Sequence, residues 1–390
     1  MSGRLSLAAA FVALIVMIAN ASAQSLPLLK DASAKKVSFA ALRDWAADDH
    51  HAAWLVFKAH CEALASKASA LRAGAVPPEA LLAVCHEAKR AVVRDSKEAR
   101  AFFERWFDPH EITPGTGAGF LTGYYEPEAE GSLTRTPAFQ APLVARPDDL
   151  VTIPQGEIWP GIPEGFAAAR RLPDGKHAVY PDRAAIMQEV SGGVSHPILW
   201  LKDDVEVFFM QVQGSGRVRL ADGKVVRIAY SGRNGHPYSS IGRIVVREGL
   251  LPLEDATLDK LKAWLRANPV QAQRIIAMNQ SYVFFRLASE LAAASGPIGG
   301  AGLPLTPWRS IAVDRTLWAY GLPVWIEVDL PLGTGKAPFR ALTIAEDTGS
   351  AMLGPERAEL YHGSGAEAGS RAGVLRHPMR FVVLWPKSVS

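Results

Sequence analysis

The change in sequence texture near Pro109 most constrains the fold of this chain. Before it, from Ser38 to about Arg105, apolar residues recur with the spacing of amphipathic helices, and Pro77-Pro78 marks the start of one helix. After it, short β-rich runs are separated by Gly, Pro, Asn and Asp. We therefore expect a mainly β protein with an α-helical amino-terminal segment.

The β-rich part contains runs typical of strands, one helical island and one flexible connection. The island spans about Leu253 to Asn279, with apolar residues at Leu258, Leu261 and Leu265. The alanine- and glycine-rich stretch from Ala292 to Leu305 predicts a linker or interdomain loop. The runs predicted as strands are VEVFFMQVQ, VRIAYSG, VVREGLL, PVWIEVDL, RALTIAED and RFVVLWPK.

Residues 1–23 have the features of a secretory signal peptide. A lone Arg4 precedes an apolar run from Leu5 to Ala19, and Ala21-Ser22-Ala23 forms a small-x-small cleavage site. The run is shorter than the roughly 20 residues that span a bilayer, which argues against a retained anchor. No cysteine follows it for a lipid. We expect a mature protein that begins at Gln24 and is soluble in the periplasm, with outer-membrane association as the alternative.

Two cysteines, Cys61 and Cys85, lie on successive helix-like apolar stripes. Export permits a disulfide between them, which would staple two packed helices. Two buried free thiols that act as small hydrophobic residues are the alternative. Neither arrangement predicts a catalytic cysteine.

Composition and missing motifs exclude several classes of function. The formal net charge is only +3, with both signs spread along the chain, so no nucleic-acid binding is predicted. No H-E-x-x-H and no paired C-x-x-C occurs, so we expect no metal site. Gly115, Gly117 and Gly119 approach a dinucleotide loop, but Phe120 occupies the position of its last glycine. We therefore expect no cofactor.

Three carboxylates near the carboxyl end are candidates for acid chemistry. Asp347 and Glu359 lie close to glycine-rich turns in AEDTGSAMLGPERAELYHGSG, and Asp314 precedes them in AVDR. Acidic residues beside glycine are often only turn residues. Glycosidases nevertheless use such side chains as general acids and bases, so all three are candidate catalytic residues.

Polar and aromatic segments set among the β-runs predict a saccharide cleft. GYYEP, QVQGSGRV, SGRNGHPYSSIGR and MNQSYVFFR combine aromatic rings with Gln, Asn, Ser and Arg. Aromatic faces stack on sugar rings, and these polar side chains hydrogen-bond to hydroxyl groups. Ordinary turn chemistry is the alternative for any one segment. The predicted substrate-binding residues are Tyr124, Gln211, Gln213, Gly214, Ser215, Gly216, Tyr238 and Ser240.

These segments, followed in order by AVDR, AEDTGSA and LYHGSGAEAGSRAG, resemble the lytic murein transglycosylase A family over about residues 119–390. The resemblance implies cleavage of the β-1,4 bond between N-acetylmuramic acid and N-acetylglucosamine in peptidoglycan, with 1,6-anhydromuramoyl products. It implies a double-psi β-barrel from residues 24–127 and 297–390, and an inserted β-barrel domain from residues 128–296 that forms the other wall of the glycan cleft. Glycan strands are the expected partner, other cell-wall enzymes are candidate partners, and we expect a monomer.

The resemblance also implies roles for the carboxylates. The carboxyl-terminal barrel is similar to a module named for three aspartates, and the first two correspond to Asp314 and Asp347. The third, the family's catalytic acid, falls on Glu359, where aspartate is expected. Glu359 would act as the single acid and base, with Asp347 as its neighbour and Asp314 in a structural or polarising role. Family members are commonly lipoproteins, and this chain has no lipid-attachment cysteine.

Two other functions remain open from the sequence. A muramidase could use Asp347 and Glu359 with water and release reducing sugar ends. Alternatively, the change from aspartate to Glu359 could have abolished turnover and left a peptidoglycan-binding protein.

Overall fold

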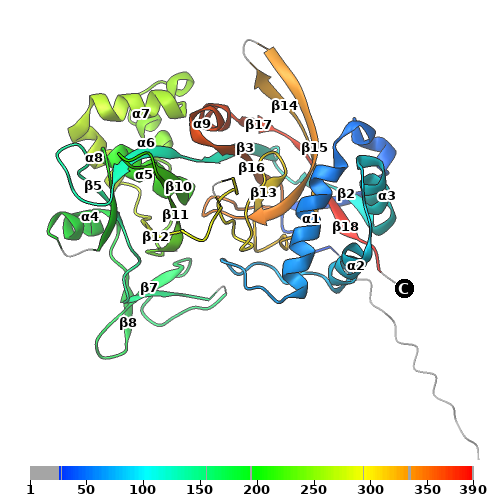
Figure 1. Ribbon diagram of the computed structural model, residues 1–390, viewed down its shortest axis with the longest axis horizontal. Helices are drawn as coiled ribbons and strands as arrows, with labels where there is room; N and C mark the ends of the chain where they lie inside the picture. The colour runs from blue at the N-terminus through cyan, green and yellow to red at the C-terminus, as the bar shows by residue number, and fades with distance from the viewer. Residues whose placement is uncertain are drawn as a thin grey trace, which may run out of the picture.

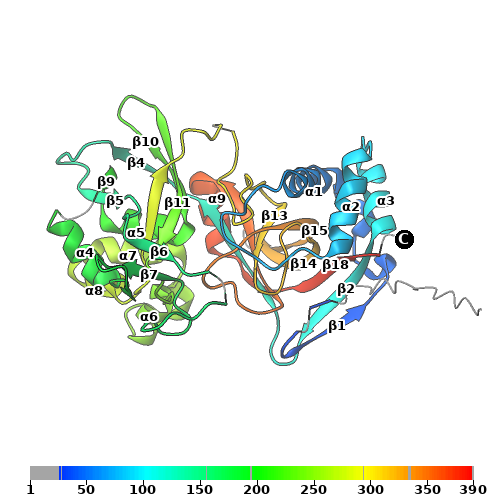
Figure 2. The same cartoon turned by 90° about the horizontal axis from the view of Figure 1, so that it is seen from below.

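The computed structural model describes residues 26–27, 29–154, 156–193, 196–292, 294–332 and 335–388. The expected signal peptide and the expected first residue Gln24 lie outside the described residues. The chain forms two lobes that lie side by side (Figures 1 and 2). One lobe carries the amino- and carboxyl-terminal segments, and the other is built from the middle of the chain.

The lobe that carries both ends of the chain is organised by a nine-stranded sheet in the order β1-β2-β18-β14-β15-β13-β16-β3-β17. Strands from before the middle of the chain and from after it therefore belong to one sheet. Its elements are β1 (Ala32–Lys36), two short 3-10 helices, α1 (His50–Ala65), α2 (Glu79–Arg90), α3 (Ser96–Trp106), β2 (Phe107–Pro114), β3 (Phe120–Glu126), β13 (Ser310–Val313), β14 (Pro323–Leu332), β15 (Gly335–Asp347), β16 (Arg357–Ser364), α9 (Gly365–Gly373), β17 (Arg376–Pro378) and β18 (Arg380–Pro386).

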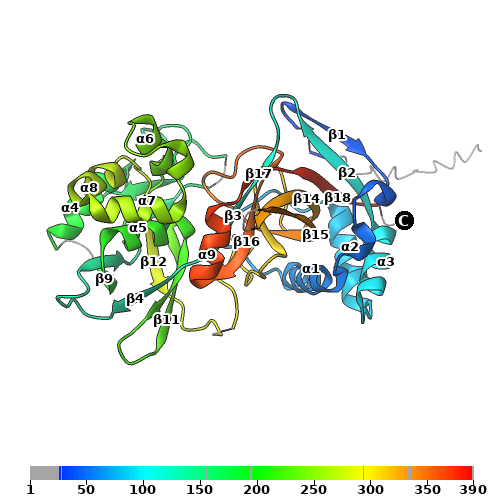
Figure 3. The same ribbon diagram turned by 90° about the horizontal axis from the view of Figure 1, so that it is seen from above.

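This sheet forms the double-psi β-barrel that was expected. β13 runs parallel to β15 and antiparallel to β16, while β16 runs parallel to β3. In that last pair Glu359 lies opposite Thr122, and Tyr361 opposite Tyr124. α9 packs on β3 and β16 (Figure 3). A Cβ at Gly123 would meet the Cα of Ala372 at 2.7 Å, so glycine permits this close approach.

Helices α1 to α3 cover the barrel, as the helical periodicity before Pro109 predicted. Their aromatic residues Trp54, Phe57 and Phe103 are fully buried in one core with Trp325 and Phe381 of the barrel. Each such side chain contributes roughly 1.5–3 kcal/mol through burial of apolar surface. The helical segment is not continuous, because an irregular loop separates α1 from α2.

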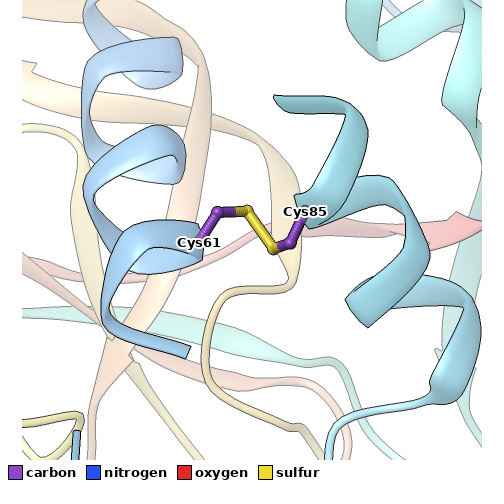
Figure 4. Close-up of a disulfide and its surroundings, with 2 residues drawn as sticks. All are labelled: Cys61 and Cys85. Atoms are coloured by element: carbon purple, nitrogen blue, oxygen red, sulfur yellow. A yellow bond between two sulfur atoms is a disulfide. The ribbon is translucent and has the colours of Figure 1, made fainter. Parts of the chain in front are cut away.

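Cys61 of α1 and Cys85 of α2 form a disulfide, with their Cα atoms 4.9 Å apart (Figure 4). Both residues are buried in the core between the helices. The bridge therefore joins the two packed helices at their contact, and neither cysteine is a free thiol.

The second lobe is a closed, six-stranded barrel with helices packed against it. The strand order is β12-β11-β10-β4-β9-β5, and a bridge between Ala145 and Phe285 joins the two edges. A separate three-stranded sheet, β6-β7-β8, extends from it. The elements are β4 (Glu128–Ser132), β5 (Ala141–Val144), β6 (Leu150–Thr152), β7 (Ala168–Arg171), β8 (His177–Val179), α4 (Arg183–Ser191), β9 (Pro197–Leu201), α5 (Asp204–Gln213), β10 (Ser215–Arg219), β11 (Val225–Arg233), α6 (Ile241–Arg247), α7 (Leu258–Ala267), α8 (Pro269–Ala277) and β12 (Val283–Leu287).

Two predicted strands are helices in this lobe, so those predictions were wrong. VEVFFMQVQ forms α5, which is buried against the barrel on one side and against α6 to α8 on the other. A helix that is apolar on all sides lacks the periodicity that distinguishes it from a buried strand. VVREGLL forms the end of α6 and the turn after it, because Ile241, Ile244 and Val245 bury one helical face despite their β-branched side chains.

The other predictions for this region hold. The helical island consists mainly of α7 and α8, which meet at Asn268-Pro269, and Leu261 and Leu265 are buried. The segment from Ala292 to Leu305 leads back to the first lobe without a helix or named strand in its described part. No helix among the described residues is both long and apolar enough to cross a membrane.

Candidate functional site

A cavity of about 200 Å³ lies between the two lobes and gathers most of the predicted site residues. It is lined by strand β3 and the segment around Asp347 from one lobe, and by α5 and the loop after β11 from the other. The predicted residues that line it are Tyr124, Gln211, Gln213, Gly214, Ser215, Tyr238, Asp347 and Glu359.

Three predicted residues lie elsewhere. Asp314 is buried and accepts hydrogen bonds from the backbone N–H and hydroxyl of Thr316 and, at 2.7 Å, from the N–H of Gly354. It therefore holds the loop before β16 and does not line the cavity. Gly216 packs against Met210, and Ser240 accepts a hydrogen bond from the N–H of Arg243 at the start of α6.

Glu359 is held in place by the pairing of β16 with β3. Its Oε1 accepts hydrogen bonds from the Thr122 hydroxyl at 2.6 Å and from Nη2 of Arg357 at 3.1 Å. Arg357 Nη2 also donates to the Thr122 hydroxyl at 2.7 Å, so the three side chains form a closed set of contacts. Within the described part of the chain both hydrogen bonds to this carboxylate end on Oε1. Oε2 is left available on a side chain that is 26% exposed.

Asp347 lies at the end of β15 and faces the same cavity. Its Oδ1 accepts hydrogen bonds from the backbone N–H groups of Gly300 at 2.7 Å and Thr348 at 2.8 Å. Burial raises the pKa of Asp347, while Arg72 and these backbone donors favour the charged form and partly offset the rise. One of its oxygens is thus committed to holding two loops together.

The Tyr124 hydroxyl lies within range of the charges of both carboxylates. It is buried, and no hydrogen bond of ordinary geometry joins it to any described residue. Burial raises the pKa of Tyr124 well above its usual value, and the negative charges of Asp347 and Glu359 raise it further. The side chain is therefore a neutral phenol whose hydroxyl oxygen is closed off from solvent beside Asp347.

The opposite wall is fixed by a buried arginine at the start of α4. Arg183 donates to Oε1 of Gln211 at 2.5 Å and to the carbonyl oxygen of Asn279 at 2.8 Å. Burial lowers the pKa of Arg183 to about 10. Gln211 Nε2 in turn donates to the carbonyl oxygen of Val283 at 3.1 Å. Both ends of the Gln211 amide therefore hold the wall together. The Gln213 side chain accepts one hydrogen bond among the described residues, from the N–H of Tyr125 at 3.1 Å.

Sequence reasoning missed several residues that shape this cavity. Arg72 comes from the loop between α1 and α2, lies 4.2 Å from the ring centroid of Tyr230, and donates to the carbonyl oxygen of Thr348 at 2.9 Å. Nothing in the local sequence indicates that this loop reaches the cleft. Arg233 belongs to the segment SGRNGHPYSSIGR, and Thr122 directly precedes GYYEP. The sequence does not show that these two side chains reach the cavity or contact Glu359; only the fold does.

Comparison with known proteins agrees with this architecture. Family models match at residues 120–286, described as the MltA specific insert domain, and at residues 309–385, described as the 3D domain. A crystal structure of a membrane-bound lytic murein transglycosylase from Agrobacterium tumefaciens is 34% identical, with a TM-score of 0.81, and the match covers 91% of this chain and 98% of that one. The chain belongs to the MltA family of lytic murein transglycosylases.

Other relatives give the same assignment. The membrane-bound lytic murein transglycosylase A of Vibrio cholerae is 36% identical over half of this chain and 54% of its own length. That of Escherichia coli K12 is 30% identical, covering 68% of this chain and 65% of the relative. The chain thus spans between about half and two thirds of these relatives. A crystal structure of E. coli MltA contains bound chitohexaose and matches with 25% identity and a TM-score of 0.59, covering 80% of this chain and 83% of that one.

Proposed function

We propose that this protein is a peptidoglycan lytic transglycosylase that cleaves the β-1,4 bond between N-acetylmuramic acid and N-acetylglucosamine. The observation that carries the proposal is the placement of Glu359 in the interlobe cavity, with Oε1 held by Thr122 and Arg357 and Oε2 available. Chitohexaose bound to the E. coli relative supports a glycan as the ligand of this fold. The three-dimensional arrangement supports a single acid and base instead of two equivalent carboxylates.

The reaction needs one group that gives and then takes a proton. Glu359, protonated on Oε2, donates to the glycosidic oxygen as the bond from C1 to that oxygen breaks. The leaving N-acetylglucosamine keeps the bonding electrons and the proton. The Glu359 carboxylate then takes the proton of the muramoyl 6-hydroxyl, whose oxygen bonds to C1 and closes the 1,6-anhydro ring. No water is consumed, so a second carboxylate to activate water is not required.

The neighbouring side chains have supporting roles in this scheme. Tyr124 stays a neutral phenol near Asp347 and Glu359, so it adds no further negative charge beside the acid. Asp347 orients the loops around the acid through Gly300 and Thr348. Asp314 acts structurally through Gly354, at the loop that leads into β16.

The proposal extends to location and organisation. We propose a periplasmic enzyme that acts as a monomer, in which residues 24–127 with 297–390 form the catalytic domain and residues 128–296 form the insert. Relatives are named membrane-bound, so the location of this protein needs a direct test. The test is to separate soluble from membrane fractions and to sequence the amino terminus of the exported protein. A mature protein fixed in the membrane by an uncleaved apolar segment would contradict the soluble form.

Product analysis tests the chemistry directly. The purified protein is incubated with cell-wall sacculi, and the released fragments are weighed by mass spectrometry. Anhydro ends weigh one water less than the reducing ends that a muramidase releases. Reducing ends would replace the proposal with the two-carboxylate hydrolase, and sedimentation with sacculi without release would replace it with a binding protein. Glu359→Gln serves as the control that should bind without releasing products.

A further inference from the structure

Two arginines, Arg72 and Arg233, line the cleft beside the proposed catalytic centre. Arg72 and Arg233 both line the cavity, and neither forms an ion pair with a carboxylate among the residues that the structure describes. Nη1 of Arg233 donates to the Ser350 hydroxyl at 2.6 Å, while Arg72 is held by Thr348 and Tyr230. The two arginines come from different lobes and converge on the same loop after β15.

Electrostatic repulsion disfavours the close approach of these arginines. Burial lowers the pKa of Arg233, and the positive charges of Arg72 and Arg315 lower it further, although Tyr230 partly offsets them. The positive charge of Arg72 favours the charged form of Asp347. The Oδ1 atom of Asp347 accepts its hydrogen bonds from backbone N–H groups and not from Arg72. Guanidinium groups that are partly desolvated and close together are stabilised when a bound anion joins them. A planar guanidinium matches a carboxylate through two parallel N–H donors.

We propose that Arg233 and Arg72 form a subsite that binds a carboxylate carried by the muramoyl residues of the glycan strand. The proposal rests on the proposed function, since it names the part of the same substrate that the cleft recognises. N-acetylglucosamine is neutral, whereas each muramoyl residue carries a lactyl ether that ends either in a free carboxylate or in a peptide with carboxylates of its own. A cationic subsite therefore distinguishes the two sugars and sets the register of the strand over Glu359.

The alternative is that Arg233 only latches the two lobes together through Ser350. A latch shapes the whole cleft, so its loss should weaken neutral and anionic ligands alike. An anion subsite affects only ligands that carry the carboxylate. Binding is therefore measured in Glu359→Gln protein, which prevents turnover, against three probes: chitohexaose, peptide-free muramoyl strands with free lactyl carboxylates, and peptide-bearing strands.

We expect Arg233→Gln to weaken binding of at least one anionic strand tenfold or more and to change chitohexaose binding less than twofold. Arg233→Lys should recover part of the lost affinity, because it keeps the charge but not the two parallel donors. Arg247→Gln, at an exposed arginine of α6 in the same lobe, is the matched control and should change nothing. If Arg233→Gln loses affinity for the peptide-free strand, the ligand is the lactyl carboxylate. If it loses affinity for the peptide-bearing strand alone, the ligand is a carboxylate of the peptide.

Equal weakening for all three probes, or no change with either anionic strand, would overturn the subsite. Should Arg233→Gln fail to fold, salt dependence in Arg233-intact Glu359→Gln protein decides the question. Affinity for anionic strands should fall as ionic strength rises, while affinity for chitohexaose should not. Absence of that difference also overturns the proposal. Since these are binding measurements, failure of the lytic activity itself is detected separately, by the product analysis of the unmodified enzyme.

Discussion

The resemblance to the family predicts that Glu359 occupies the position of its catalytic aspartate, and shortening the side chain by one methylene tests whether this cleft has adjusted to glutamate. The Glu359 Oε1 to Thr122 Oγ1 distance is 2.6 Å. One C–C bond is about 1.5 Å long, so removing a methylene withdraws the carboxylate by about 1 Å or more. That displacement takes the contact with Thr122 beyond hydrogen-bond range. The contact with Arg357 at 3.1 Å is lost as well. Misplacement of a reacting group by about 1 Å can cost about a hundredfold in rate.

We therefore expect Glu359→Asp to release soluble fragments from sacculi about a hundredfold more slowly than the natural protein. Glu359→Gln, nearly isosteric but unable to give up a proton, should be inactive and still bind. Glu367→Asp is the matched control, because Glu367 is exposed on α9 and pairs only with Arg371 among the contacts described. Faster release by Glu359→Asp would refute the adjusted cleft. Full activity of Glu359→Gln would remove Glu359 as the acid and shift that role to Asp347.

Three further predictions concern stability and cofactors. Non-reducing peptide mapping should recover Cys61 linked to Cys85, and replacing both with alanine should cost about 3 kcal/mol of unfolding free energy, whereas two alkylatable thiols would contradict the bridge. Burial raises the pKa of Glu346 to about 8 from 4.5, so the native state keeps a proton that the unfolded state loses. Stability should thus fall between pH 4.5 and 8, by up to about 1.4 kcal/mol per unit, and Glu346→Gln should remove that slope in melting curves. Release of fragments from sacculi should persist in a chelator, and reversible loss of activity on removing a divalent ion would contradict a metal-free reaction.

The strands of the barrel were predictable because each has a local signature. PVWIEVDL and RALTIAED form the antiparallel pair β14 and β15, and RFVVLWPK forms β18 beside it. Their β-branched and aromatic residues suit a pleated, buried surface, and no competing helical periodicity is present. The helices before Pro109 were predictable because their apolar residues recur with helical spacing.

Helix α5 shows where such reasoning fails and which signal would have corrected it. Its apolar residues face the barrel and the other helices at once, so periodicity carries no information. Its ends are nevertheless marked in the sequence. The Asp203 side chain accepts the N–H of Glu206 at the first turn, and Gly214 adopts the left-handed conformation at the end. In this segment the capping residues indicate the observed helix, and the apolar run does not.

The candidate site was predictable in its motifs but not in its side-chain directions. Asp314 was grouped with Asp347 and Glu359, yet its oxygens point to Thr316 and Gly354. The direction of a side chain at a strand end depends on the register of its neighbours, which the local sequence does not specify. Arg72 was not predictable at all, because it meets Thr348 only after the chain has crossed both lobes.

Strand β3 links the geometry of the acid to that of the opposite wall. Thr122 and Tyr124 on this strand contact or adjoin Glu359, and Glu126 ends the strand where the chain enters the insert. Glu126 is fully buried and accepts hydrogen bonds from Arg217 and Arg227 of the insert, at 2.7 and 2.8 Å.

Glu126 also accepts a hydrogen bond from the hydroxyl of Ser364, at the end of the strand that carries Glu359, at 2.7 Å. One buried carboxylate therefore joins β3, β16 and the insert. Removing Glu126 would leave Arg217 and Arg227 without this carboxylate partner, so the side chain is needed to keep the strands and the insert in contact. Glu359 and the opposite wall of the cavity are thereby joined through one buried carboxylate.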